Sequence, residues 1–206
     1  EIRTTNPLPL FIEVYAGHDR TSAIYQYLSA PVVGLFDLGR ITTRFVAAAS
    51  GWLAVLFVWL FARRMFGWKA GLIALAAMAA HPTGLIFSRW AQQGILALLF
   101  TVAGFWALWE VPRVDPKHRR ALAIVAGILL ALAAYSYAPA RLVVPLLLGA
   151  FALCLGKEMW RQHWRAIAWP IVIFLAIYTP VFFYTVGPGS SRLEKVGIFD
   201  EGLDII

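Results

Sequence analysis

Three arginines stand beside long apolar runs of this sequence: Arg44, Arg89 and Arg141. A guanidinium group is a planar fork of N–H donors that matches the oxygens of a phosphate. Arg141 follows two tyrosines, Tyr135 and Tyr137, across a short segment that contains a proline. These side chains predict a site for a lipid-linked phosphate, with the two tyrosines lining the pocket. The alternative is that each arginine alone anchors the chain at a membrane surface.

Few other side chains in the sequence have the types and positions that a reaction needs. His81 precedes a proline in an apolar run, which fits a proton donor, a substrate contact, a pigment ligand or a simple kink. No acid lies within the apolar runs, so Glu13 and Asp19 are the weak candidates for a general base, or else solvated loop residues. No two histidines or cysteines have metal-site spacing, and no metal or cofactor is required.

The composition indicates a polytopic membrane protein. Hydrophobic residues make up 61% of the chain and charged residues 14%, with a mean hydropathy of +0.72. Soluble domains average about 45–50% apolar and about 25% charged residues. The net charge of +7 does not indicate a nucleic-acid partner, because the basic residues gather in short loops.

Six apolar runs predict spanning helices, because helices satisfy their own backbone in lipid whereas open strands do not. They are Phe45–Ala62, Ala70–Ser88, Trp90–Trp109, Ala121–Ala140, Leu142–Gly156 and a segment within Ala166–Ser191. Before them, residues 24–35 have the spacing of a helix in the membrane interface, capped by Thr21 or Ser22 and bent at Pro31. The predicted fold is therefore an all-α membrane helix bundle with about six transmembrane helices and one interfacial helix.

We expect one membrane domain over residues 1–206. It comprises an outer loop with a juxtamembrane helix (1–40), the transmembrane helices (41–186) and an outer tail (187–206). One set of loops holds ten basic and three acidic residues, and the other holds eight of each. The positive-inside rule places the first set in the cytoplasm and both chain ends outside. The tyrosines then lie near the outer face, as an aromatic belt or as the lining of a polar cavity.

Several short motifs occur in an order that is similar to a known family. They are Tyr25–Ala30 with Leu35 and Phe36, Thr43–Val46 around Arg44, Ala62–Gly67, Phe87–Arg89 with Gln93 and Gly94, Tyr135–Arg141, and Gly187–Phe199. With these motifs the sequence resembles the GT-C glycosyltransferases, and within them the bacterial protein mannosyltransferases and lipid A aminoarabinose transferases.

The resemblance implies an enzyme of the bacterial cytoplasmic membrane that moves a sugar from a polyprenyl-phosphate donor to an acceptor on the outer face. Arg44, Arg89 and Arg141 would bind the lipid phosphate. The resemblance also implies that the catalytic acid lies in the first outer loop. We expect this chain to begin within that loop, without the preceding span or the soluble C-terminal domain.

The alternative is a non-catalytic scaffold, derived from such a transferase, that serves as a subunit of a larger membrane complex. In that interpretation His81 binds a pigment, and the partners are membrane lipids and other membrane subunits. A transporter is disfavoured because the sequence shows no pair of matching halves with broken helices.

Overall fold

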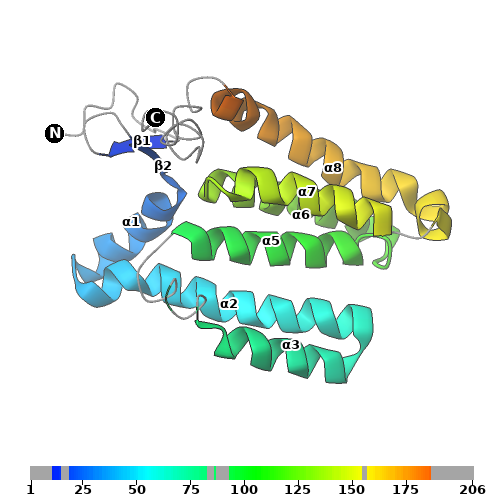
Figure 1. Cartoon of the computed structure of the whole chain (residues 1–206), viewed down its shortest axis with the longest axis horizontal. Coiled ribbons are helices and arrows are strands. Elements are labelled where there is room, and N and C mark those ends of the chain that lie inside the picture. The colour runs from blue at the N-terminus through cyan, green and yellow to red at the C-terminus, as the bar shows by residue number, and fades with distance from the viewer. Residues whose placement is uncertain (1–10, 15–18, 83–85, 87–92, 155–156, 187–206) are drawn as a thin grey trace, which may run out of the picture.

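The computed structural model describes residues 11–14, 19–82, 86, 93–154 and 157–186. In this part of the chain a two-stranded hairpin precedes seven helices (Figure 1). The strands are β1 (Phe11–Val14) and β2 (Asp19–Ser22), and the helices are α1 (Ile24–Phe36), α2 (Arg40–Phe66), α3 (Trp68–Ala80), α5 (Gln93–Glu110), α6 (Pro116–Ser136), α7 (Ala140–Cys154) and α8 (Lys157–Val186).

Four helices are long and apolar enough to cross a membrane: α2, α5, α6 and the segment Ala166–Phe183 of α8. The predicted helical membrane bundle is thereby confirmed. Two runs predicted to span form shorter helices, α3 with 13 residues and α7 with 15. α3 ends at Ala80 because Pro82 disfavours a helical residue before it, and His81 accordingly has extended backbone angles. The rest of the predicted Ala70–Ser88 span lies largely outside the described residues.

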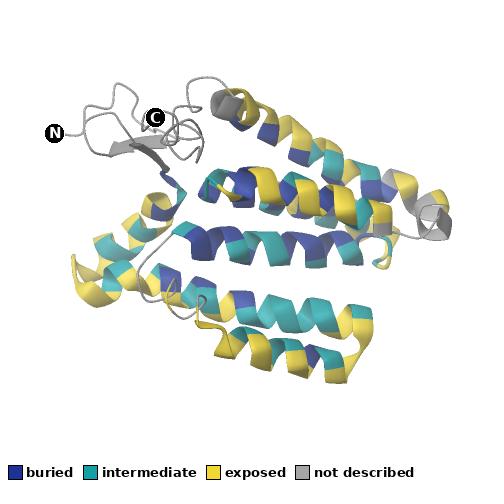
Figure 2. Ribbon diagram, in the orientation of Figure 1, coloured by how far each residue is buried: buried dark blue, intermediate teal, exposed yellow. Residues whose placement is uncertain are grey.

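α5 lies at the centre of the bundle, between α2 on one side and α6 on the other (Figure 1). α3 packs on the outside of α2, while α7 and α8 pack on α6. Figure 2 shows buried residues concentrated along α5, mostly intermediate residues along α2 and mostly exposed residues along α3. In the most apolar window of each span, 61% of the residues of α5 are buried but only 22% of those of α2. Lipid would cover the exposed apolar face of α2.

Small residues allow the central helices to approach closely. A Cβ atom at Gly104 of α5 would lie 2.8 Å from the side chain of Leu130 on α6. A Cβ atom at Gly127 of α6 would lie 2.7 Å from the carbonyl oxygen of Pro170 on α8. No real Cβ makes contacts this short, so both positions require glycine for the helices to pack as they do.

Most of the basic loop residues gather at one end of the bundle, which we call the basic end. It is formed by the C-terminal ends of α2, α5 and α7 and the N-terminal ends of α3, α6 and α8 (Figure 1). There Arg64 of α2 forms an ion pair with Glu110 of α5, with 2.9 Å between Nε and Oε1. Glu110 is one of the three acidic residues counted with the basic loops, but it is the last residue of α5 and is buried. The pairing with Arg64 explains why this carboxylate tolerates burial.

The first described residues correct the prediction for the start of the chain. The sequence predicts an irregular loop with a helix cap at Thr21 or Ser22, whereas β1 and β2 form an antiparallel hairpin with Val14 opposite Asp19. α1 begins at Ile24, and its backbone N–H donates to the hydroxyl of Ser22 at 3.3 Å. Strand pairing therefore extends to Ser22, one of the two residues predicted to cap the helix. Pro31 lies within α1, where the bend was predicted.

The close approach of α6 and α8 yields a stability prediction. Gly127→Ala should lower the free energy of unfolding by about 1–3 kcal/mol, because the added methyl group must displace the backbone of α8. Gly149→Ala in α7 is the matched control, since a Cβ atom at that position would have no neighbouring atom within 4 Å. That change should be neutral or slightly stabilising, because alanine favours a helix more than glycine does. Thermal unfolding in detergent measures both, and equal effects would contradict this packing.

Candidate functional site

The segment Tyr135–Arg141 forms the link between α6 and α7, which we call the corner. α6 ends at Ser136 and α7 begins at Ala140, as the proline in this segment predicts. The backbone N–H of Arg141 donates to the carbonyl of Ala138 at 3.1 Å, and the next two N–H groups donate to Pro139. The first turn of α7 therefore uses its own backbone donors. An anion at the corner would have to be bound by side chains.

Arg141 is buried, with 7% of its surface exposed. In a regular helix its carbonyl would accept a hydrogen bond from the N–H four residues later, but that residue is Pro145, which has no N–H. The hydroxyl of Tyr178 on α8 donates to this carbonyl instead, at 2.7 Å. A side chain from a neighbouring helix thus satisfies the backbone group that the proline leaves without a donor.

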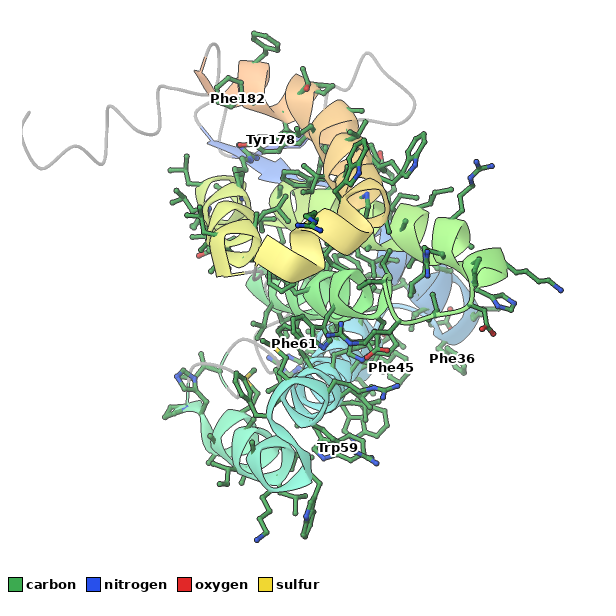
Figure 3. The ribbon with its side chains drawn as sticks, turned by 90° about the vertical axis from the view of Figure 1, so that its right-hand side faces the viewer. Phe36, Phe45, Trp59, Phe61, Tyr178 and Phe182 are labelled. Carbon is green, nitrogen blue, oxygen red and sulfur yellow. The ribbon has the colours of Figure 1, made fainter. Side chains whose placement is uncertain are left out.

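A second tyrosine makes the reverse connection between the corner and α8. The hydroxyl of Tyr135 on α6 donates to the carbonyl of Ile177 on α8 at 3.0 Å. The ring of Tyr178 stacks on that of Phe174, with 5.1 Å between centroids and 11° between planes. Figure 3 shows Tyr178 and Phe182 following each other along α8. Two hydroxyl-to-carbonyl bonds therefore fix the corner against α8, and the ring stack within α8 orients Tyr178.

The corner combines a positive charge with two hydroxyl groups. The hydroxyl of Tyr178 lies at the carbonyl of Arg141, and the hydroxyl of Tyr135 lies at the carbonyl of Ile177, so both mark the junction of the corner with α8. A charge removed from bulk water interacts more strongly with an opposite charge than a solvated one does. Chemically, this arrangement suits binding of a phosphate by the guanidinium.

The remaining predicted residues are placed as follows. Tyr137 is half-buried at the corner, where its carbonyl accepts from the N–H of Ala140 at 3.0 Å. Arg44 is exposed near the N-terminus of α2, a helix that packs on α1, α3 and α5, whereas α7 packs on α6. The structure thus brings Arg141 together with Tyr135 but does not place Arg44 beside them. Arg89 lies outside the described residues.

The other candidate residues lie away from the corner or have undescribed side chains. His81 is exposed just after α3, and its role as a pigment ligand or proton donor stays a prediction. Glu13 pairs with Arg20 in the register of the hairpin, and Asp19 begins β2, but their side chains lie outside the described residues. Within the described residues, no group of three His, Cys, Asp or Glu side chains could hold a metal ion.

Two hydrogen bonds attach the hairpin and α1 to the bundle. The amide of Gln93, at the start of α5, donates to the carbonyl of Ser22 at 2.9 Å. The hydroxyl of Tyr25 on α1 donates to the carbonyl of Thr43 on α2 at 2.7 Å. Burial raises the pKa of the Tyr25 hydroxyl. The chain segment that carries the candidate acids is thereby anchored at the N-terminal ends of α2 and α5.

Sequence reasoning missed Tyr178 and Gln93 as parts of this region. For Tyr178 the signal is Pro145, because a proline in a predicted span implies that a neighbouring helix must supply a hydrogen-bond donor to the freed carbonyl. The sequence does not say which hydroxyl that is. For Gln93, an amide at the start of an apolar run indicates a buried partner but does not identify the carbonyl of Ser22.

The helices and their apolar surfaces define an integral membrane protein. A family model described as dolichyl-phosphate-mannose-protein mannosyltransferase matches residues 22–184 of the chain. The chain therefore belongs to this family, which makes it a membrane glycosyltransferase of the GT-C type and confirms the resemblance. The matched segment contains the corner and all seven described helices except the last two residues of α8. No curated protein and no solved structure matches the chain.

The bond between Gln93 and Ser22 can be tested by proteolysis. Gln93→Leu should speed trypsin cleavage after Arg20 by about twofold to tenfold, because a hydrogen bond contributes about 0.5–1.5 kcal/mol to closure of the segment. Ser29→Ala is the control, since its hydroxyl donates within α1 to the carbonyl of Tyr25. Unchanged cleavage in Gln93→Leu would show that this bond does not hold the hairpin against α5.

Proposed function

We propose that this chain transfers a sugar from a polyprenyl-phosphate donor to an acceptor at the end of the bundle that carries the corner. The observation that supports this most directly is the burial of Arg141 at the corner, where Tyr178 of α8 donates to its carbonyl and Tyr135 of α6 donates to α8. The family description names dolichyl phosphate mannose, which is a sugar on a polyprenyl phosphate. The distribution of basic residues favours the corner on the non-cytoplasmic face, and the resemblance implies that the membrane is a bacterial cytoplasmic membrane.

The proposed reaction exchanges one bond at the sugar carbon for another. An acceptor hydroxyl attacks the anomeric carbon as the bond from that carbon to the phosphate oxygen breaks, which inverts the configuration. Negative charge grows on the departing phosphate, where a fixed cation stabilises the transition state most. Arg141 would supply that cation, and Tyr135 and Tyr137 would line the pocket. Glu13 and Asp19 stay predictions for the base that takes the acceptor proton.

We narrow the prediction that Arg44, Arg89 and Arg141 together bind the lipid phosphate. Arg141 is buried at the corner, whereas Arg44 is exposed on a helix that does not pack on α7. We therefore expect Arg141 to carry most of the interaction with the donor phosphate. Arg89 stays a prediction as a further contact to this phosphate, whereas Arg44 lies on α2, which α5 separates from the corner.

Removal of the corner cation tests the proposal. Arg141→Ala should lower transfer from polyprenyl-phosphate sugar by about 100-fold or more, because a fixed charge-stabilising group contributes about 3–4 kcal/mol to the barrier. Arg141→Lys should recover part of this loss, since it keeps the charge but not the planar fork. Transfer is measured with purified protein in nanodiscs that contain the donor.

Arg120→Gln is the matched control for this experiment. Arg120 is exposed at the opposite end of α6, so its loss changes net charge without touching the corner. It should leave transfer within about twofold of wild type. Wild-type transfer by Arg141→Ala would reject the proposed role of the corner.

A further inference from the structure

At the corner, a side-chain hydroxyl takes the place of a backbone N–H as the hydrogen-bond donor to the carbonyl of Arg141. Within α7, Pro145 removes the N–H that would bond to the carbonyl of Arg141, and it does so at the residue that carries the buried charge. The hydroxyl of Tyr178 fills that place at 2.7 Å, across 37 residues of sequence. The carbonyl of Arg141 is therefore bonded to α8, whereas its N–H bonds locally to the carbonyl of Ala138.

Tyr178 is itself held in place. It is buried, and its ring stacks on the buried Phe174 one turn earlier in α8. The hydroxyl of Tyr135 bonds to the carbonyl of Ile177, the residue just before Tyr178. This carbonyl lies in the turn before Pro180, where a proline weakens the helical hydrogen bonds. α6 thus donates a tyrosine hydroxyl to α8, and α8 donates one to α7, in each case to a carbonyl near a proline.

We propose that Tyr178 is a positioning residue that fixes the guanidinium of Arg141 for the donor phosphate, and that Pro145 makes this dependence on α8 possible. The inference rests on the proposed function of Arg141. If the helix supplied its own donor at position 145, Tyr178 would be dispensable for the position of Arg141. With proline there, movement of α8 shifts Arg141 directly.

The test is a double-mutant cycle on binding of sugar-free polyprenyl phosphate to the protein in nanodiscs. Tyr178→Phe should weaken binding about tenfold, because the carbonyl of Arg141 loses its donor and the guanidinium loses its fixed position. Pro145→Ala alone should bind within about threefold of wild type. Pro145→Ala combined with Tyr178→Phe should recover to the same range, because the new N–H at position 145 bonds to the carbonyl.

Two controls separate this effect from general stabilisation. Pro180→Ala combined with Tyr178→Phe should still bind polyprenyl phosphate about tenfold more weakly than wild type. Pro180 also lies within a helix, but an N–H at position 180 of α8 would not take the place of the missing donor to the carbonyl of Arg141. Thr179→Val removes a neighbouring hydroxyl that bonds within α8 to the carbonyl of Leu175, and it should bind like wild type. A general gain in helix stability would instead make both proline replacements rescue Tyr178→Phe.

Failure of this inference is distinct from failure of the proposed function. Wild-type binding by Tyr178→Phe, or no recovery in the double variant with Pro145→Ala, would overturn the positioning role while wild type still binds. No binding of polyprenyl phosphate by wild type would overturn the proposed function. In that case thermal unfolding of the same variants tests whether the hydroxyl of Tyr178 replaces the missing N–H at position 145. Tyr178→Phe should lower Tm, and adding Pro145→Ala to that variant should restore it.

Discussion

The structure depends on one constraint: each backbone N–H and C=O in the apolar layer must find a partner within the protein. Long helices meet this requirement without help from neighbours, which is why the apolar runs form α2, α5, α6 and α8. The requirement becomes demanding where a proline interrupts a helix. At Pro145 it brings a hydroxyl from another helix to the carbonyl of Arg141, and so it joins three helices at the corner.

Close packing at the centre of the bundle makes these connections possible. Because lipid tails are as apolar as the helices, the hydrophobic effect does little to drive their association in a membrane. Helix association depends instead on van der Waals packing and on hydrogen bonds between helices. Gly104 and Gly127 bring α5, α6 and α8 near enough for such contacts. The tyrosine hydroxyls reach carbonyls on a neighbouring helix because the helices already lie this close. The glycine contacts and the corner are therefore parts of one arrangement.

Much of the fold could be predicted from sequence because charges interrupt long apolar runs. The position of the corner follows from Arg141 between two such runs, and the early end of α3 fits Pro82. The hairpin could not be predicted, because short mixed segments near chain starts carry little periodicity. The burial of Glu110 was missed because a charge at the edge of a run is ordinarily assigned to water, and its pairing with Arg64 joins residues far apart in the chain.

The residues of the candidate site were chosen from their types, and their role stays a prediction. Residue types identify Arg141 and Tyr135 as chemically suitable, and the structure places them together. Sequence cannot reveal that α5 separates α2 from the corner, because that is a property of how helices pack.

The hydroxyl of Tyr178 also sets an order of events during biosynthesis. The chain is made from its N-terminus, so α6 and α7 enter the membrane before the residues of α8 have left the ribosome. Until Tyr178 arrives, the carbonyl of Arg141 lacks the donor that satisfies it in the finished protein. The corner is thus completed only after Tyr178 has emerged from the ribosome. A nascent chain stalled before that point would insert its earlier helices and still lack the mature corner.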